Sequence, residues 1–86
     1  MSIMYRTAAR VNHGQHDWDT VWESDNCKTQ KAAKAALDAS PLDWMRIDAC
    51  VLYRVYVSID GDEAAIPIAK QAFTPHTGWS TWKRIA

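Results

Sequence analysis

Apolar and mixed positions alternate along residues 48–60, DACVLYRVYVSID, in the middle of the chain. Period-two alternation with β-branched and aromatic residues predicts a strand that lays one face on a core. The intervening positions include Arg54 and Tyr56. We expect this segment to be the central strand of a sheet. Its apolar or aromatic set is Ala49, Val51, Tyr53, Val55, Val57 and Ile59.

A β-hairpin is predicted ahead of the central strand. Residues 3–12 and 17–24 alternate, and His-Gly-Gln-His at residues 13–16 suits a two-residue type II′ turn. Such a turn pairs His13 with His16 and thereby fixes the register. One face of the hairpin then pairs opposite charges, Arg10 with Asp19 and Arg6 with Glu23.

One main helix is predicted after the hairpin. Ser24-Asp25-Asn26 supplies N-cap residues, and the following segment, KTQKAAKAALDAS, is rich in good helix formers. We expect a short second helical turn over residues 41–46, with Ser40 as its N-cap. The buried stripe of the main helix is mostly alanine and comprises Ala33, Ala36, Leu37 and Ser40. Three lysines lie outside this stripe, namely Lys28, Lys31 and Lys34.

Two more strands are predicted after the central strand. Asp60-Gly61 is typical of a type I′ turn, which would place Ile66 opposite Val55. Residues 62–73 then form a strand, and a helix over the same residues is the alternative that Pro67 disfavours. Thr74 to Gly78 predicts a further turn, and residues 79–85 alternate as a last strand.

The predicted fold is α+β, a two-layer sandwich with the element order ββαβββ. A right-handed crossover through the helix gives an antiparallel sheet of four to five strands in the order 2-1-3-4-5, with the helix on one face. A length of 86 residues predicts one compact domain over residues 1–86.

Charge and cysteine content narrow the class of protein. The net charge is zero at pH 7, which gives no support for a polyanion partner. Arg6 and Arg10 lie where a signal peptide needs an apolar region, and no apolar run is long enough for a membrane span. We therefore expect a cytoplasmic protein with Cys27 and Cys50 reduced. A disulfide between these two cysteines is the alternative.

Candidate catalytic chemistry finds little support in the sequence. His13 and His16 flank a turn, but a structural zinc site needs four ligands and the cysteines have no CxxC spacing. We interpret both histidines as polar turn residues. Nucleophile-elbow and glycine-rich phosphate-binding motifs are absent from the sequence. We expect a non-enzymatic protein without metal or cofactor.

The sheet face away from the helix is the predicted binding surface. Arginine and tyrosine are favoured at protein interfaces, although a solvated face with cross-strand ion pairs is the alternative. By the predicted registers this face carries Met4, Arg6, Arg10, Asp19, Glu23, Leu52, Arg54, Tyr56 and Trp82. We expect a protein-binding module whose partner contacts Arg6, Arg10, Arg54, Tyr56 and Trp82. Proteins of this size, with alternating charge segments and no cofactor, are frequent among phage and mobile-element accessory factors, some of which inhibit host enzymes or defence complexes. By this analogy of size and composition, which is not a family match, inhibition of a host protein or defence complex is one expectation.

The sequence also allows two alternatives to the protein-binding hypothesis. The first is a nucleic-acid-binding module that uses Lys28, Lys31 and Lys34. Over eight residues, QKAAKAAL resembles the basic helix of double-stranded-RNA-binding domains, although that family has a different order of elements. The second is a homodimer or larger homo-oligomer that pairs through an exposed sheet edge or face.

Overall fold

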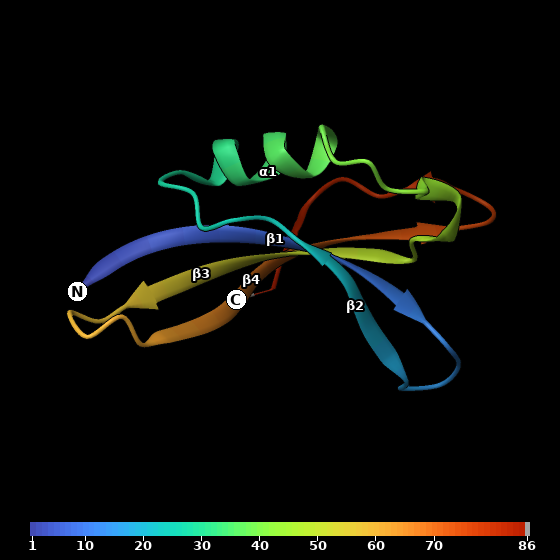
Figure 1. Ribbon diagram of the computed structural model, residues 1–86. Coiled ribbons are helices and arrows are strands. Elements are labelled where there is room, and N and C mark those ends of the chain that lie inside the picture. Colours follow the sequence, from blue (N-terminus) through green and yellow to red (C-terminus); the bar gives the residue numbers. More distant parts are fainter. Residues whose placement is uncertain (86) are drawn as a thin grey trace.

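The computed structural model describes residues 1–85 as a curled antiparallel sheet with one helix on its outer side (Figure 1). This architecture confirms the predicted α+β class. The elements are β1 (Ser2–Asn12), β2 (Trp18–Glu23), α1 (Gln30–Asp38), the single 3-10 turn η1 (Trp44–Arg46), β3 (Ala49–Val57), β4 (Glu63–Thr74), β5 (Gly78–Trp79) and β6 (Lys83–Arg84). Within residues 1–85, no helix has the length and apolar character that crossing a membrane requires.

The strands follow the order β2-β1-β3-β4-β5, as predicted, and β6 also pairs with β4. Residues 63–74 form a strand, so the alternative helix over this region is wrong. The ladder between β3 and β4 shifts by one residue between Leu52 and Tyr53, where Ile68, beside Pro67, has no paired residue on β3. The predicted last strand is only partly correct, because residues 80–82 separate the short strands β5 and β6.

The first hairpin closes with a three-residue loop instead of the predicted two-residue turn. The His13 N–H donates to the Asp17 carbonyl at 2.8 Å, and Gly14 and Gln15 both have positive φ angles, 124° and 49°. Asp19 consequently pairs with Val11, and the predicted partnership of Asp19 with Arg10 is wrong.

The second hairpin also has a loop that is one residue longer than predicted. The Ser58 N–H donates to the Asp62 carbonyl at 2.8 Å, and Gly61 adopts a φ of 88°. A type I turn followed by a left-handed glycine is the usual form of such a loop. Ile66 therefore pairs with Arg54, in place of the predicted Val55.

The helix packs on the outer side of the sheet through small residues, as its alanine stripe predicts. Thr7 on β1 donates its hydroxyl to the Ala33 carbonyl of α1 at 2.8 Å. The helix begins later than predicted, because Thr29 rather than Ser24-Asp25-Asn26 caps it and accepts from the Ala32 N–H. The buried cluster beneath it comprises Ala9, Leu37, Ile47 and Cys50, and the partly buried side chains packed against this cluster are Val11, Trp22, Leu42, Trp44, Trp79 and Trp82.

The predicted short helix over residues 41–46 is a single 3-10 turn that begins only at Trp44. The Asp43 carboxylate accepts from the Met45 N–H, so Asp43 caps the turn in place of Ser40. This turn directs Trp44 onto the core and leaves Met45 exposed.

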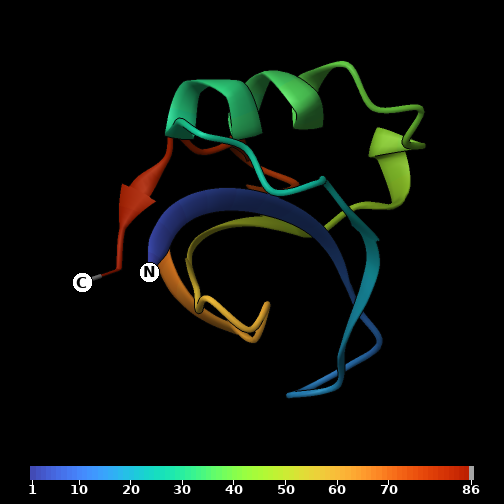
Figure 2. The ribbon, with the colours of Figure 1, turned by 60° about the vertical axis from the view of Figure 1, so that its left-hand side comes forward.

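The inner side of the sheet is buried as well. Figure 2 shows β1 as an arch beneath α1, with β3 and β4 curling below it. Val55 is 0% exposed and Val51 is 8% exposed, yet both lie on the side away from the helix. The curl thus shields apolar residues on both sides of β3, whose buried outer residues are Cys50 and Leu52.

Candidate functional site

The residues predicted to form one binding face lie on two faces. Arg54 pairs with Tyr5 across β1 and β3, whereas Arg6 pairs with Tyr53. Paired residues on antiparallel strands share a face, and successive residues alternate between faces. Thr7 contacts α1, so the odd-numbered residues of β1 lie on the outer side of the sheet. Arg54 and Tyr56 therefore lie on the outer side, while Arg6 and Arg10 lie on the inner side, so the predicted shared face is wrong.

A groove of about 550 Å³ lies on the outer side, between the start of α1, β4 and the C-terminal segment. We call it the outer groove. It brings together Arg54 and Trp82, which were predicted to bind protein, and Lys34, which was predicted to bind nucleic acid. Its lining residues include Gln30, Lys34, Arg54, Ile66, Trp82 and Arg84.

The outer groove is positively charged and partly apolar. The Lys34 ammonium lies 5.3 Å from the centre of the Trp82 ring, a cation–π contact. Lys34 and Arg54 form no ion pair with a carboxylate among residues 1–85. Hydrogen bonding to Tyr56 and Tyr5 raises the pKa of the Arg54 guanidinium. None of the lining residues that the structure describes is acidic.

The three lysines that were predicted to bind nucleic acid do not lie together on the helix. Lys28 precedes the Thr29 N-cap and lies outside α1. Lys31 is on α1 and exposed, whereas Lys34 is half-buried against Trp82. Only Lys34 of the three lines the outer groove.

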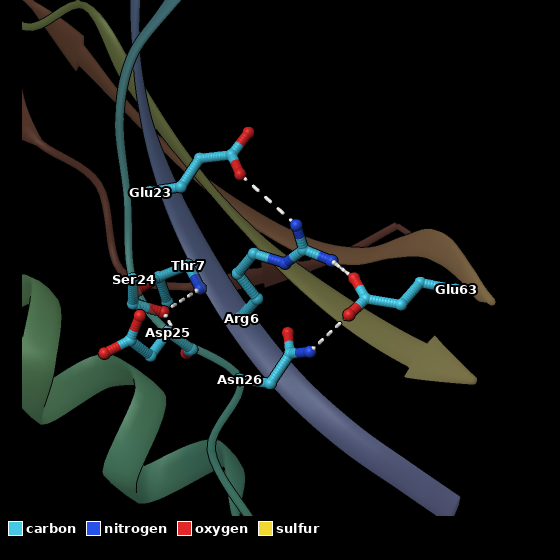
Figure 3. Close-up of polar contacts among 7 residues, drawn as sticks. All are labelled: Arg6, Thr7, Glu23, Ser24, Asp25, Asn26 and Glu63. Atoms are coloured by element: carbon cyan, nitrogen blue, oxygen red, sulfur yellow. Dashed lines mark hydrogen bonds and ion pairs between the residues drawn. The ribbon is translucent and has the colours of Figure 1, made fainter. Parts of the chain in front are cut away.

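The Arg6 guanidinium takes part in an ion-pair network on the inner side of the sheet (Figure 3). Its guanidinium lies 3.3 Å from the Glu23 carboxylate and 2.9 Å from the Glu63 carboxylate. The predicted contact of Arg6 with Glu23 therefore forms, but the predicted register is wrong, because Ala8 is paired with Glu23 across the strands. Asn26 donates to the second oxygen of Glu63 at 2.9 Å. Asn26 follows β2, and Glu63 begins β4, so the network joins segments on opposite sides of the β1–β3 pair. Arg6 thus has a structural environment that already neutralises its charge.

Arg10 has a different environment from Arg6. The carbon of its guanidinium lies 5.7 Å from the centre of the Trp18 ring. Its predicted partner Asp19 lies instead 3.6 Å from the His13 imidazole. Arg10 therefore has an aromatic ring as its neighbour in place of the predicted carboxylate.

Several residues of these surfaces were missed by the sequence analysis. Ile66 lies in the outer groove because it pairs with Arg54, and the predicted register placed it opposite Val55 instead. Gln30 and Arg84 reach the outer groove only through the packing of α1 and the C-terminal segment, and no local sequence pattern marks such a contact. The correct register of the second hairpin would have identified Ile66 as a residue of the outer groove.

Metal-ligand chemistry and the two thiols can be assessed in the part of the chain that the structure describes. No cluster of three or more His, Cys, Asp or Glu residues is placed to hold a metal ion there. Cys27 and Cys50 are not bonded to each other. Burial raises the pKa of the Cys50 thiol to about 11, and the charge on Asp38 adds to this effect. A buried, protonated thiol is a poor nucleophile.

Comparisons with protein-family models, with curated proteins and with solved structures find no match to this chain. The candidate function is therefore inferred from the charge and geometry of the outer groove.

Proposed function

We propose that this protein is a non-enzymatic protein-binding module that holds an acidic, partly apolar segment of a partner in the outer groove. The observation that supports this proposal is the pair of cations Lys34 and Arg54, which lack carboxylate partners among the described residues and lie beside Ile66 and Trp82. Ile66 is 48% exposed. A carboxylate next to an apolar side chain complements such a surface in both charge and polarity.

A protein partner fits this groove better than a nucleic acid does. Phosphate backbones are bound by several cations along a track, and the net charge of this chain is zero. Lys28 and Lys31 lie outside the groove lining, whereas two isoleucines, Ile66 and Ile68, belong to it. Nucleic-acid binding remains the alternative, supported by Trp82 and Arg54 together, because aromatic rings and arginines bind single-stranded bases.

A nuclear magnetic resonance titration of the ¹⁵N-labelled protein tests the proposal. The probe is a short synthetic peptide of Glu, Asp and Leu, and a peptide with Lys in place of the acidic residues is its control. We expect the acidic peptide to shift the amide signals of Gln30, Lys34, Arg54 and Ile66, and the basic peptide to shift none of them. Shifts confined to other parts of the protein would contradict the proposal.

Matched variants make the test specific to the outer groove. Arg54→Gln should weaken binding of the acidic peptide at least about tenfold, because one charge-assisted hydrogen bond contributes about 1.5–3 kcal/mol. Lys31→Gln removes an equal charge from an exposed position outside the groove lining and should leave the affinity unchanged. A single-stranded oligonucleotide serves as the competing probe. If it binds more tightly than the peptide, with affinity that falls steeply with salt, the nucleic-acid alternative replaces the proposal.

We propose that the partner is a host protein or defence complex that this module inhibits, as some phage and mobile-element accessory factors do. Co-purification from a host lysate should then recover the same protein with wild type and Lys31→Gln but not with Arg54→Gln. Equal recovery with all three proteins would contradict a role for the outer groove.

A further inference from the structure

A second pocket, of about 210 Å³, lies on the inner side of the sheet, on the face opposite the outer groove. We call it the inner pocket. Its lining residues are Arg10, Trp18, Ala49, Val51, Lys70 and Ala72. The strands place these residues together because Arg10 pairs with Ala49, Ala49 pairs with Ala72, and Val51 pairs with Lys70.

The spacing of the two cations suits one anion held between them. Arg10 is on β1 and Lys70 is on β4, so the single strand β3 separates them. Neighbouring strands lie about 4.8 Å apart, which puts the two backbones about 10 Å apart. Ala49 and Ala72 have small side chains and leave the space between the cations open. Two long cationic side chains can therefore approach the same ligand from opposite sides.

Neither cation is neutralised within residues 1–85. The Arg10 guanidinium has no hydrogen-bond acceptor among these residues, and its Nε atom is buried without a partner. Lys70 likewise has no carboxylate partner in the described chain. Asp48 precedes Ala49 in the chain, but its carboxylate accepts from the Asn12 N–H at 2.8 Å. Arg6, on the same face of β1, has two carboxylate partners, whereas Arg10 has none among the described residues.

We infer that the inner pocket binds a small phosphate monoester, a phosphate group attached to a compact apolar body such as one ring. The planar guanidinium of Arg10 donates in the fork geometry that phosphate oxygens accept, and Lys70 supplies a second positive charge. The contact with Trp18 orients the guanidinium, and Val51 adds an apolar wall. A volume of 210 Å³ equals that of about seven water molecules at roughly 30 Å³ each, which admits a phosphate and one ring.

Titration of the ¹⁵N-labelled protein with phenyl phosphate tests this inference. Inorganic phosphate, benzoate and phenol are the comparison probes. We expect saturable shifts of the Arg10, Val51, Lys70 and Ala72 amide signals with phenyl phosphate, weaker binding of inorganic phosphate and no binding of phenol. Benzoate that binds as tightly as phenyl phosphate would overturn the phosphate assignment in favour of a carboxylate ligand. Phenol that binds equally well would overturn any anion site.

Variants of Arg10 and Lys70 distinguish binding in the inner pocket from a general effect of the charge of the protein. Lys70→Gln and Arg10→Gln should each weaken phenyl phosphate about tenfold or more, whereas Lys31→Gln on the opposite side of the sheet should not. Lys70 is exposed, so its substitution leaves the fold intact and decides the matter even if Arg10→Gln unfolds. Equal affinity for wild type and Lys70→Gln, or the absence of saturable shifts in wild type, would overturn the inference. The acidic peptide should bind Lys70→Gln normally, which distinguishes failure here from failure of the outer groove.

Discussion

Thr7 donates its hydroxyl to the backbone carbonyl of Ala33 at 2.8 Å, and both residues are 0% exposed. This hydrogen bond fixes α1 on β1. Thr7→Val keeps the shape of the side chain but leaves a buried carbonyl without this donor. We expect the free energy of unfolding to fall by about 1–2 kcal/mol, measured by urea denaturation.

Thr20→Val is the matched control for that substitution. Thr20 lies on β2 and is exposed, so the same chemical change there should alter the free energy of unfolding by less than about 0.5 kcal/mol. Equal losses in the two variants would mean that the Thr7 hydrogen bond does not stabilise the packing of α1.

The ion pair between Arg6 and Glu63 should make a small contribution to stability. Glu63 keeps 39% of its side-chain surface exposed, and such pairs contribute about 0–1 kcal/mol. Glu63→Gln should therefore cost less than about 1 kcal/mol, and the cost should shrink in high salt. A double-mutant cycle with Arg6→Gln measures the coupling energy directly. A coupling that is unchanged by salt would contradict an electrostatic origin.

Cys50 should make the stability depend on pH in the alkaline range. Its pKa is about 11 in the folded protein because the thiol is buried, against about 8.5 for an exposed thiol. Between these values the unfolded chain loses the proton first, so stability falls as the pH rises, by up to about 1.4 kcal/mol per pH unit. The stabilisation is complete below about pH 8.5 and is lost as the pH passes through 11.

The comparison with Cys50→Ala isolates this effect from the titration of lysines and tyrosines. The difference in unfolding free energy between wild type and the variant should be constant from pH 6 to 8 and should then decline, in chemical denaturation series at each pH. A difference that stays constant up to pH 10.5 would contradict the raised pKa of Cys50.

Both edges of the sheet are interrupted, which bears on the homo-oligomer hypothesis. The β1–β2 ladder shifts between Ala9 and Arg10, where Val21 is left unpaired. The part of β4 that pairs with neither β5 nor β6 contains Pro67, which has no N–H to donate. Bulges and prolines at edges disfavour strand pairing between molecules. We expect a monomer over a range of concentrations in light scattering. A stable dimer would show that another surface mediates association.

The order of the strands was predictable from the sequence, whereas the faces of the strands were not. Alternation located the main segments, and the helical crossover dictated that β3 lies beside β1. Both loops are one residue longer than predicted, and Gln15 adopts a positive φ that no glycine signals. A slip of one residue moves every side chain of a strand to the other face.

The hydrophobic pattern could not correct this error because β3 is apolar on both sides. Val55 is completely buried on the inner side, and Leu52 is buried on the outer side. The curl of the sheet, which depends on contacts across the whole domain, shields the inner valines without a covering helix (Figure 2). The separation of Arg54 from Arg6 follows from the same geometry. Charge composition alone could reveal the cations, but only the register assigns each one to a surface.

Successive residues of β3 alternate strictly between the two sides of the sheet, so substitutions can change one surface without changing the other. Even-numbered positions, including Arg54, face the helix side, while odd-numbered positions, including Val51, face the interior of the curl. A variant library restricted to one parity can therefore redesign one surface and preserve the other. An insertion of one residue within β3 would instead exchange the faces of the residues on one side of the insertion, so deletions and insertions here should be tolerated less well than substitutions.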